Sequence, residues 1–341
     1  MSTRPQAGFS LVELMVACTV GLIILGVIGS VYDNSKQITR VNDTISRLQE
    51  NGRFAIQLLD RDLRMAGFRG CGGPTIAPVN VLNSTSYLYQ YAVGLTGNKA
   101  SGGGWLPSLD AALTSLSPSP GTGADVVTLR YIDGPGVPLS ARMASPTDTL
   151  QVSAGSPLAT GDIVLVADCA ASAIFHATNF VAGTGVISHD AGVGAAPTNT
   201  TTNLGQIFGT DASAYRLVTK TYFIAPSARK PNIKSLWINS VPNYDGQPQP
   251  VEMVEGVERF LMLYGEDTDG DQAANRYVAA DAVGNWTNVV SAKALLLLAT
   301  TNDNMATSPQ PYTFNGVTTT PTDRRMRQSL TSLITLRNRT P

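Results

Sequence analysis

The sequence predicts an α+β protein in which one long N-terminal helix precedes a β-rich head. No proline occurs between Pro5 and Pro74, which leaves room for a long unbroken helix. After Pro74, short alternating segments are separated by turns rich in Gly, Pro and Asn, and no second long helix is evident. These two observations define the fold class.

The first part of the predicted helix is the apolar run from Phe9 to Tyr32. Its 24 residues span roughly 36 Å as a helix, which is enough to cross a hydrocarbon layer of about 30 Å. Glu13 lies near the start of this run, where an acid costs on the order of 3 kcal/mol. Cleavage between Gly8 and Phe9 would create a cationic α-amine four residues away, and a neighbouring copy would bring another. Glu13 is therefore predicted to pair with such an amine.

Three other interpretations of this segment exist. A secretory signal has an apolar core of about 7–15 residues, shorter than this one, and does not explain Glu13. A lipoprotein site at Cys18 would leave a long apolar continuation after the cysteine and Glu13 inside the preceding core. A plain membrane anchor also leaves Glu13 unexplained.

The second part of the predicted helix is amphipathic and ends at about Ala66. Apolar residues recur at steps of three and four, as expected for one helix face that packs on a sheet. They are Ile38, Val41, Ile45, Leu48, Ala55, Leu59 and Leu63. Gly52 interrupts this stripe and is a position where the helix could bend. Gly67 is the predicted stop signal.

The predicted strands all lie after residue 124. They are Val126–Ile132, Thr149–Val152, Asp162–Asp168, Ala173–Val181, Arg216–Ile224, Ser235–Asn239, Val251–Tyr264, Val289–Ala299 and Gln328–Leu336. The stretch from Cys71 to about Ala124 is predicted to be irregular, and Gly183–Thr202 is predicted to be a mobile loop.

Composition favours an extracytoplasmic protein. The net charge is −1 and only 14% of residues are charged, so no specific nucleic-acid partner is expected. The basic leader with Arg4 suggests a cytoplasmic N-terminus, which leaves the head outside the cytoplasm. No Gly-x-Ser-x-Gly elbow is present, and no catalytic residue or enzymatic activity is predicted.

Two cysteines of the head are candidates for a disulfide. Cys71 and Cys169 both fall in the exported part, where disulfides persist, and we expect them to be bridged. The alternative is two buried free thiols. Cys18, in the apolar run, is expected to be a small packing residue.

One acidic motif is a candidate calcium loop. Asp267, Asp269 and Asp271 place carboxylates at alternating positions, as at the start of a calcium-binding loop. Gln272 and Val278 stand where an EF-hand has Gly and Glu, so the alternative is a polar turn between two strands. No other cofactor is expected.

The C-terminus is basic. Two interpretations are open. The arginines could contact a partner, namely an acidic neighbouring subunit, DNA or lipid headgroups, or they could form a solvated strand face with no partner. The residues are Arg324, Arg325, Arg327, Arg337 and Arg339.

The N-terminal motif Gly8-Phe9-Ser10-Leu11-Val12-Glu13-Leu14 resembles the class III signal of type IV pilins and type II secretion pseudopilins. The resemblance implies cleavage after Gly8 by a prepilin peptidase and N-methylation of Phe9. It also implies that Glu13, the fifth residue of the mature chain, pairs with a neighbouring N-terminus during assembly.

Two later stretches resemble the PilW branch of minor pilins. They are 254–271, leading to Trp286, and 323–339; Gln49–Ala55 and Ala66–Cys71 fit the same pattern. The resemblance implies a type IV pilin-like fold, with a leader at 1–8, a transmembrane half-helix at 9–32, an amphipathic half at 33–70 and a head at 71–341.

The implied function is that of a minor pilin that helps to initiate pilus assembly at or near the tip. Expected partners are the prepilin peptidase, other minor pilins, the major pilin and a tip adhesin. The expected location is the inner membrane of a Gram-negative bacterium, with a periplasmic head, and then the extracellular pilus. A J-type pseudopilin of type II secretion and a membrane-anchored adhesin that never polymerises are the alternatives.

Overall fold

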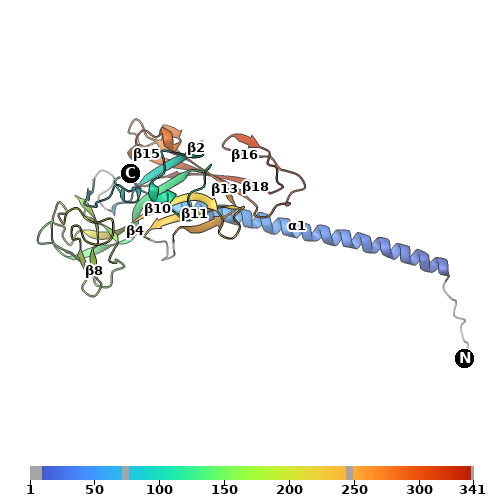
Figure 1. Ribbon diagram of the computed structural model, residues 1–341, viewed down its shortest axis with the longest axis horizontal. Coiled ribbons are helices and arrows are strands. Elements are labelled where there is room, and N and C mark those ends of the chain that lie inside the picture. The colour runs from blue at the N-terminus through green and yellow to red at the C-terminus, as the bar shows by residue number, and fades with distance from the viewer. Residues whose placement is uncertain (1–9, 71–76, 243–248, 339–341) are drawn as a thin grey trace, which may run out of the picture. The chain divides into compact units, whose positions relative to one another are not determined.

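The computed structural model describes residues 10–70, 77–242 and 249–338 (Figure 1). Gly8, Phe9, Cys71 and Arg339 lie outside these ranges. The chain divides into two compact units, residues 1–50 and residues 51–341. The second unit is the head.

A single helix, α1 (Leu11–Met65), contributes to both units. It ends where the sequence predicts: Gly67 has φ 76°, and its N–H donates to the carbonyl oxygen of Arg130 at 2.9 Å. A positive φ is the left-handed conformation that glycine adopts without steric cost at a helix C-terminus. The Arg130 carbonyl thus joins the end of the helix to a strand of the head.

Within the head, α1 buries the predicted apolar face. Ala55, Leu59 and Leu63 are fully buried. The helix continues through Gly52, where a Cβ atom would lie 2.4 Å from Cδ1 of Leu330. Gly52 therefore leaves the space into which Leu330 of strand β18 (Arg327–Thr335) packs.

The larger sheet has 12 strands. Its main path runs β1-β7-β6-β10-β4-β5-β9-β8, while β11 and β12 extend from β10 and β2 and β3 extend from β4. The bounds are β1 (Val79–Asn80), β2 (Leu95–Ser101), β3 (Gly104–Leu106), β4 (Val126–Ala141), β5 (Leu150–Val152), β6 (Ile163–Ala167), β7 (Ser172–His176), β8 (Asn179–Val181), β9 (Val186–Ser188), β10 (Ser213–Pro226), β11 (Lys234–Val241) and β12 (Val251–Glu255).

Two long antiparallel strands, β4 and β10, connect two parts of this sheet. The first residues of β10 pair with β6, and residues from Thr219 to Pro226 pair with β11. The pairing of β10 with β4 shifts register between Ala214 and Arg216, where the partnership changes. Such a bulge increases local twist, which allows one pair of strands to serve two groups of neighbours.

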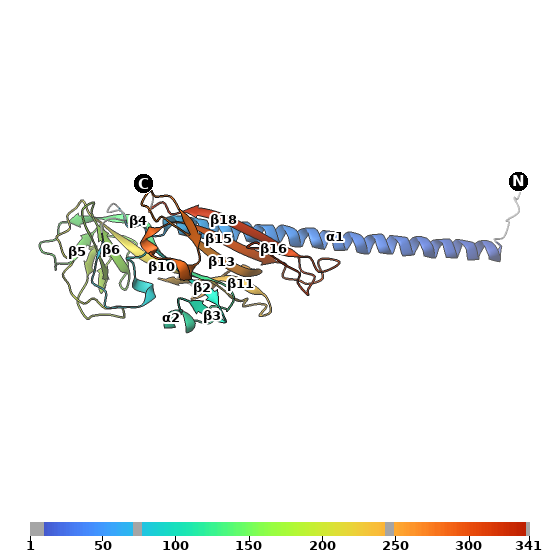
Figure 2. The same ribbon diagram turned by 90° about the horizontal axis from the view of Figure 1, so that it is seen from above.

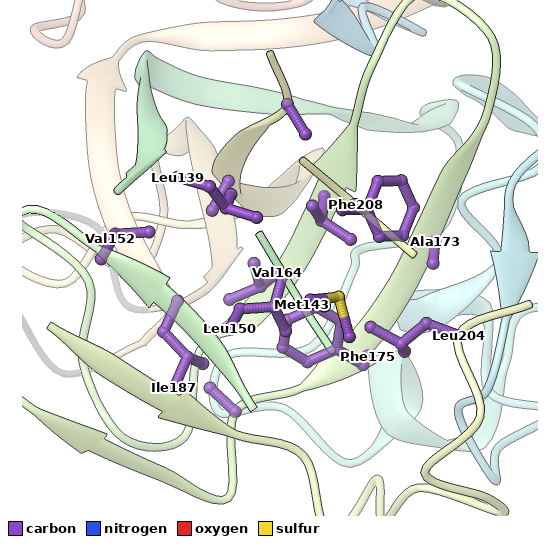
Figure 3. Close-up of a cluster of buried hydrophobic side chains, with 14 of the residues drawn as sticks. Leu139, Met143, Leu150, Val152, Val164, Ala173, Phe175, Ile187, Leu204 and Phe208 are labelled. Carbon is purple, nitrogen blue, oxygen red and sulfur yellow. The ribbon is translucent and has the colours of Figure 1, made fainter. Parts of the chain in front are cut away.

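A separate hydrophobic cluster lies among β5, β6, β7 and β9. Phe175, Ile187 and Phe208 are fully buried there, and Figure 3 shows their side chains directed into a common centre with Leu150 and Met143. This part of the head has its own core, which explains why a long stretch of irregular connections between short strands is ordered.

The second sheet has four strands in the order β14-β13-β15-β18, and a hairpin, β16–β17, follows β15 in the chain (Figure 2). Phe314 of the hairpin packs against Leu295 and Leu297 of β15. The bounds are β13 (Val257–Glu266), β14 (Arg276–Val278), β15 (Val289–Ala299), β16 (Tyr312–Phe314), β17 (Val317–Thr319) and β18 (Arg327–Thr335).

The prediction that the stretch from Cys71 to Ala124 is irregular is in part wrong. It contains the hairpin β2–β3, which turns at Gly102 and Gly103, both with positive φ. It also contains the short helix α2 (Ala111–Thr114), capped by the Asp110 carboxylate. Strand β2 has a glycine and polar residues where a strand usually has β-branched or aromatic ones, so its pattern was too weak to predict it.

The prediction of one strand from Val251 to Tyr264 is wrong, because the structure has two strands there, β12 and β13. Gly256, with φ 89°, ends β12 in the large sheet and starts β13 in the small one. Its N–H donates to the Lys234 carbonyl of one sheet, and its carbonyl accepts from the N–H of Ala299 in the other. A Cβ at Gly256 would lie 2.6 Å from the Ala299 oxygen, so the crossing point accepts only glycine without displacement.

Two further predictions fail near residue 180. The predicted strand Ala173–Val181 is divided into β7 and β8, which pair with different neighbours. The predicted mobile loop Gly183–Thr202 contains β9 and the buried Asn199. Asn199 bonds the backbone N–H and carbonyl of His176 through its amide, at 2.8 Å each. These contacts join a polar segment to the core of the sheet.

Candidate functional site

The N-terminal unit presents one membrane-spanning candidate. Among the described residues, α1 is the only helix that is long and apolar enough, and its best 18-residue window has a mean hydropathy of 2.6 with none of it buried. Most of the large apolar side chains from Leu11 to Tyr32 are exposed within this chain. Such a surface needs lipid or other apolar helices around it.

Glu13 lies in the first turn of α1 and is exposed. Its Oε2 lies 3.5 Å from the backbone nitrogen of Ser10, the residue just before the helix. A glutamate three residues after the N-cap stabilises a helix N-terminus by reaching back in this way, and the helix dipole favours an anion there. The carboxylate is therefore held at the end of the helix and remains open to a partner.

The processing residues Gly8 and Phe9 lie outside the described residues.

The predicted disulfide involves one described residue. Cys169 lies in the tight connection between β6 and β7, and Cys71 lies outside the described ranges. The pairing of Cys71 with Cys169 stays a prediction. Cys18 is a free and exposed thiol on the apolar part of α1.

The three aspartates of the predicted calcium loop converge after β13. One carboxylate oxygen of each of Asp267, Asp269 and Asp271 lies within 4.8 Å of the others. Asp267 is buried, while Asp269 and Asp271 are exposed. Carboxylate oxygens are the ligands that Ca²⁺ prefers, so these three residues would hold the ion.

The same loop also stabilises its buried carboxylate without a cation. Asp267 accepts backbone N–H groups of Gly270 at 2.6 Å, Gln272 at 2.8 Å and Asp269 at 3.2 Å. Burial would raise the pKa of the Asp267 carboxyl, but these N–H donors hold it below its ordinary value. The buried carboxylate thus has backbone donors of its own, and calcium stays a prediction.

The anchoring of α1 in the head depends on a buried charge that the sequence analysis missed. Asp62 accepts from Nζ of Lys220 at 3.0 Å and from the Tyr222 hydroxyl at 2.5 Å, and both partners lie on β10. Burial alone would raise the pKa of the Asp62 carboxyl, but the Lys220 ammonium and the Tyr222 hydroxyl hold it below its ordinary value. The sequence held one indication of this buried charge: Asp62 directly precedes Leu63, which lies on the apolar face of the helix.

A second buried cation holds the connection that follows β1. Arg130 of β4 is 2% exposed, and its guanidinium donates to the carbonyl oxygens of Tyr87 and Val93. Burial lowers the pKa of Arg130 to about 10. Carbonyl oxygens satisfy the donors of this buried charge and join the connection to β4.

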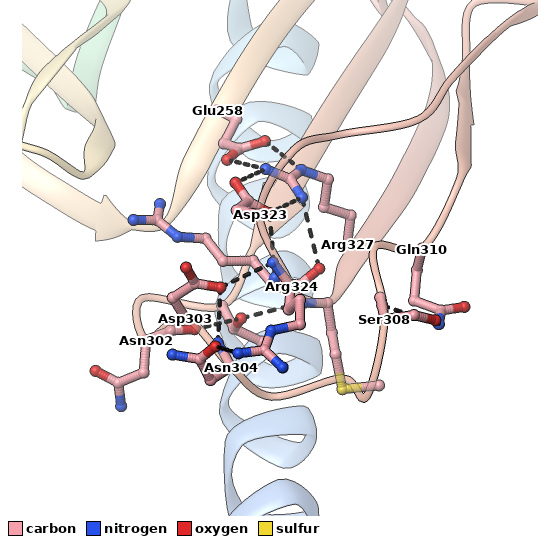
Figure 4. A network of polar contacts seen from close by, with 12 residues as sticks. Glu258, Asn302, Asp303, Asn304, Ser308, Gln310, Asp323, Arg324 and Arg327 are labelled. Atoms are coloured by element: carbon pink, nitrogen blue, oxygen red, sulfur yellow. Dashed lines mark hydrogen bonds and ion pairs between the residues drawn. The ribbon is translucent and has the colours of Figure 1, made fainter.

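The basic C-terminus is in part an internal network, shown in Figure 4. Arg327 forms paired hydrogen bonds with Glu258 at 2.7 and 3.0 Å, and it bonds both oxygens of Asp323 at 2.7 and 2.8 Å. Arg324 bonds Asn304 and, through its backbone N–H, Asp303. Arg327 is therefore not a residue for partner contact, which corrects the sequence-based interpretation for this position. Arg337 is exposed, and Arg339 lies outside the described residues.

Comparisons with known proteins find similarity in two parts of the chain. The family described as Type IV Pilus-assembly protein W matches residues 221–338, from within β10 to three residues beyond β18. The prokaryotic N-terminal methylation motif matches residues 3–29. A comparison with curated proteins found no match. Among solved structures, a type IV-like pilin from Thermus thermophilus is similar at 12% identity, over 86% of this chain and 99% of that chain, with a TM-score of 0.35.

A methylation-type N-terminus, an apolar helix with one acid near its start and a β-rich head together define a protein of the type IV pilin class. Residues 221–338 of this chain are similar to the PilW family of type IV pilus-assembly proteins.

Proposed function

We propose that this chain is a minor pilin that helps to initiate a type IV pilus and remains at or near its tip. The observation that carries the proposal is Glu13, a single carboxylate held at the N-terminal end of an otherwise apolar, exposed helix. After cleavage at Gly8, the carboxylate pairs with the α-amine of Phe9 in a neighbouring subunit. The mechanism is assembly, with no catalytic step by this chain.

The pair acts as a register device. A charge buried without its partner costs several kcal/mol, and an opposite charge offsets that cost only at close range. A subunit inserted at the wrong height would leave its carboxylate unpaired among apolar side chains. The correct height is therefore the one at which the apolar residues of α1 are covered and Glu13 is neutralised.

The placement at the tip follows from the size and irregularity of the head. A helical array repeats one contact surface at every subunit, and long connections between short strands are hard to repeat in it. This head has such connections from Arg142 to Thr149 and from Asp190 to Ala212, together with a separate core. A low-copy subunit that starts the array has no subunit above it and avoids that constraint.

The expected partners are the prepilin peptidase, other minor pilins, the major pilin and a tip adhesin. The chain would first be held in the inner membrane of a Gram-negative cell by α1, with the head in the periplasm. It would then leave the membrane with the growing filament.

The first experiment is mass spectrometry of the N-terminus of this chain in filaments sheared from the cell surface. An N-methylated Phe9 is the expected result. A chain that retains its first eight residues, or that begins at an acylated Cys18, would overturn the proposal.

The second experiment compares Glu13→Ala with Asp33→Ala, which also removes one exposed acid but lies beyond the apolar run. We expect Glu13→Ala to be processed normally and to be lost from sheared filaments by at least about tenfold, while Asp33→Ala is retained. Equal retention of both variants would indicate a simple membrane anchor.

The third experiment locates the subunit. Labels on the head should appear at filament ends, and uniform labelling along the filaments would contradict the tip placement. Loss of protein secretion with normal pili, on deletion of the chain, would favour a J-type pseudopilin.

A further inference from the structure

Strand β18 forms one edge of the four-stranded sheet. It pairs with β15 from Arg327 to Thr335, and the register has no shift along this length. Among residues 10–70, 77–242 and 249–338, no strand pairs with its other side. The last strand of the chain is therefore a straight edge of 9 residues.

The ladder shows which residues face the free edge. The N–H of Leu336 donates to the Val290 carbonyl, and the N–H of Thr300 donates to the Met326 carbonyl, both at 2.9 Å. In an antiparallel pair, hydrogen-bonded residues alternate with residues that point their backbone groups away. The backbone N–H and carbonyl groups of the even-numbered residues of β18 thus bond to β15. Those of the odd-numbered residues point away from β15, toward the free edge. The odd-numbered residues are Arg327, whose charge is paired with Glu258 and Asp323, and the four uncharged residues that follow on this side, called the outward residues: Ser329, Thr331, Leu333 and Thr335.

The outward residues form an uncharged surface without backbone partners. Within the described part of the chain, no hydrogen bond uses their backbone N–H or carbonyl groups. All four side chains are exposed, and Leu333 is 60% exposed. Backbone groups at such an edge are ready to pair with another extended chain.

Other edges in the head have the features that normally prevent pairing. β12 has 5 residues, carries Glu252 and Glu255, and is shifted in register against β11. β14 has 3 residues, and its Arg276 is paired with Glu266. Natural sheets protect their edges by short length, charge and bulges, and β18 has none of these along 328–335.

We propose that the free edge of β18 is a docking site for an extended segment of a different pilin-class chain, which adds to the sheet as a fifth strand. The inference rests on the proposed function, because it names a contact through which the head joins other subunits. In this mode, backbone hydrogen bonds supply affinity and alternate side chains supply specificity. The segment would be uncharged, with an apolar or β-branched residue beside Leu333 and small or hydroxylated residues beside the threonines.

The geometry disfavours a second copy of this chain as the occupant. An antiparallel pair of two β18 strands needs a two-fold axis perpendicular to the sheet. The part of α1 around Gly52 lies against the face of this sheet, since a Cβ atom at Gly52 would meet the side chains of Leu330 and Leu298 (Figure 2). The axis would reverse the helix of one copy, whereas subunits of one membrane or filament have the same polarity. A parallel pair of two β18 strands would need one strand to be shifted by one residue along its length relative to the other, and a two-fold axis provides no such shift.

The experiment places a photo-crosslinking phenylalanine analogue at position 333 of the full-length chain in cells that assemble pili. The control position is 317, because Val317 is also an exposed apolar residue (64%) of the head but lies at the β16–β17 hairpin. The expected result is an adduct from position 333 to a strand-like segment of another pilin-class chain, identified by peptide mass spectrometry, and at least about tenfold less of it from position 317.

A backbone variant tests the hydrogen bonds. Thr331→Pro removes one outward N–H but no hydrogen bond to β15, a place where edge strands accept proline. Its matched control is Thr331→Val, which has nearly the same shape and keeps the N–H. With the crosslinker at 333, we expect Thr331→Pro to reduce the adduct at least about fivefold and Thr331→Val to leave it unchanged. Protein level and N-terminal processing of each variant show whether it still folds and enters the pathway.

The inference is overturned by an adduct to a second copy of this chain, by equal adducts from 333 and 317, or by adducts that Thr331→Pro does not reduce. If Thr331→Pro fails to accumulate, Leu333→Lys with Leu333→Thr as control replaces it, with the crosslinker moved to position 335. Failure of these tests with a methylated Phe9 in filaments leaves the proposed function intact. An unprocessed N-terminus would instead refute the proposed function itself.

Discussion

Asp62 and Lys220 form an ion pair of 3.0 Å whose side chains are 3% and 10% exposed. The two residues are 158 positions apart, so the pair joins the last turns of α1 to the central strand β10. A buried pair contributes little net stability relative to apolar residues, but removal of one partner leaves an uncompensated charge. This contact therefore fixes where the helix meets the head.

The first prediction concerns this pair. Asp62→Ala should lower the free energy of unfolding of the head by about 3–5 kcal/mol, because Lys220 keeps its charge in a buried position. Urea denaturation of the purified full-length chain in detergent measures the change. Asp60→Ala is the control: it breaks a partly exposed ion pair with Arg64 on the same helix and should cost about 0–1 kcal/mol. Equal losses in the two variants would show that the buried pair is unimportant.

The second prediction concerns acid stability. Hydrogen bonds from Arg327 lower the pKa of Asp323 to about 2, from an ordinary value of 3.8. A carboxyl with a depressed folded-state pKa stabilises the fold above its unfolded pKa, and this contribution disappears as pH falls through the folded value. Asp323→Asn should therefore lower the melting temperature at pH 6, and its difference from the unmodified protein should shrink between about pH 4 and pH 2.

The control for this titration is Asp133→Asn, which removes a carboxylate from an exposed ion pair with Arg216. Its melting temperature should stay close to that of the unmodified protein across the same range, because exposed pairs contribute about 0–1 kcal/mol. A difference for Asp323→Asn that persists unchanged at pH 2 would contradict the assignment.

The third prediction concerns Gly52. Its missing side chain leaves room for Leu330, so Gly52→Ala should destabilise the head by about 1–3 kcal/mol through overpacking, although alanine favours helices. The double variant Gly52→Ala/Leu330→Val should recover part of that loss. Gly26→Ala, where a Cβ meets nothing within 4 Å, should not destabilise the head. A neutral or stabilising Gly52→Ala would mean that Leu330 moves aside at no cost.

The fourth prediction separates the two roles of the aspartate loop. Asp267→Ala should lower the melting temperature with or without calcium, because three backbone N–H groups lose their acceptor. Binding of Ca²⁺ should raise the melting temperature of the unmodified protein but not that of Asp269→Asn/Asp271→Asn, which keeps Asp267. If millimolar Ca²⁺ does not raise the melting temperature of the unmodified protein, the motif is a turn and not a calcium site.

Elements with strong local signals could be predicted from the sequence. Strand Val289–Ala299 was predicted with its observed bounds, and the helix was predicted to within two residues at each end. In the predicted strand Gln328–Leu336, Ile334 and Leu336 are buried while Thr331 and Thr335 are exposed, which is the alternation expected of a strand with one buried face. Period and end signals are properties of neighbouring residues, so they can be read without a tertiary structure.

Elements that depend on distant partners could not be predicted. Strand β2 is stable because β4 and β3 pair with it, and β12 and β13 separate because Gly256 bonds to two different sheets. Arg327 appeared to be a surface charge, but Glu258, 69 positions away, makes it internal. No local pattern reports such a contact.

The sequence alone determined the class of this protein, because the cleavage motif, the apolar run and Glu13 follow one another along the chain and act through local chemistry. Only the tertiary structure decided how the head holds the helix, which charges are internal and which strand edge is open. These features depend on residues far apart in sequence, and burial sets the strength of their interactions, which sequence spacing does not reveal.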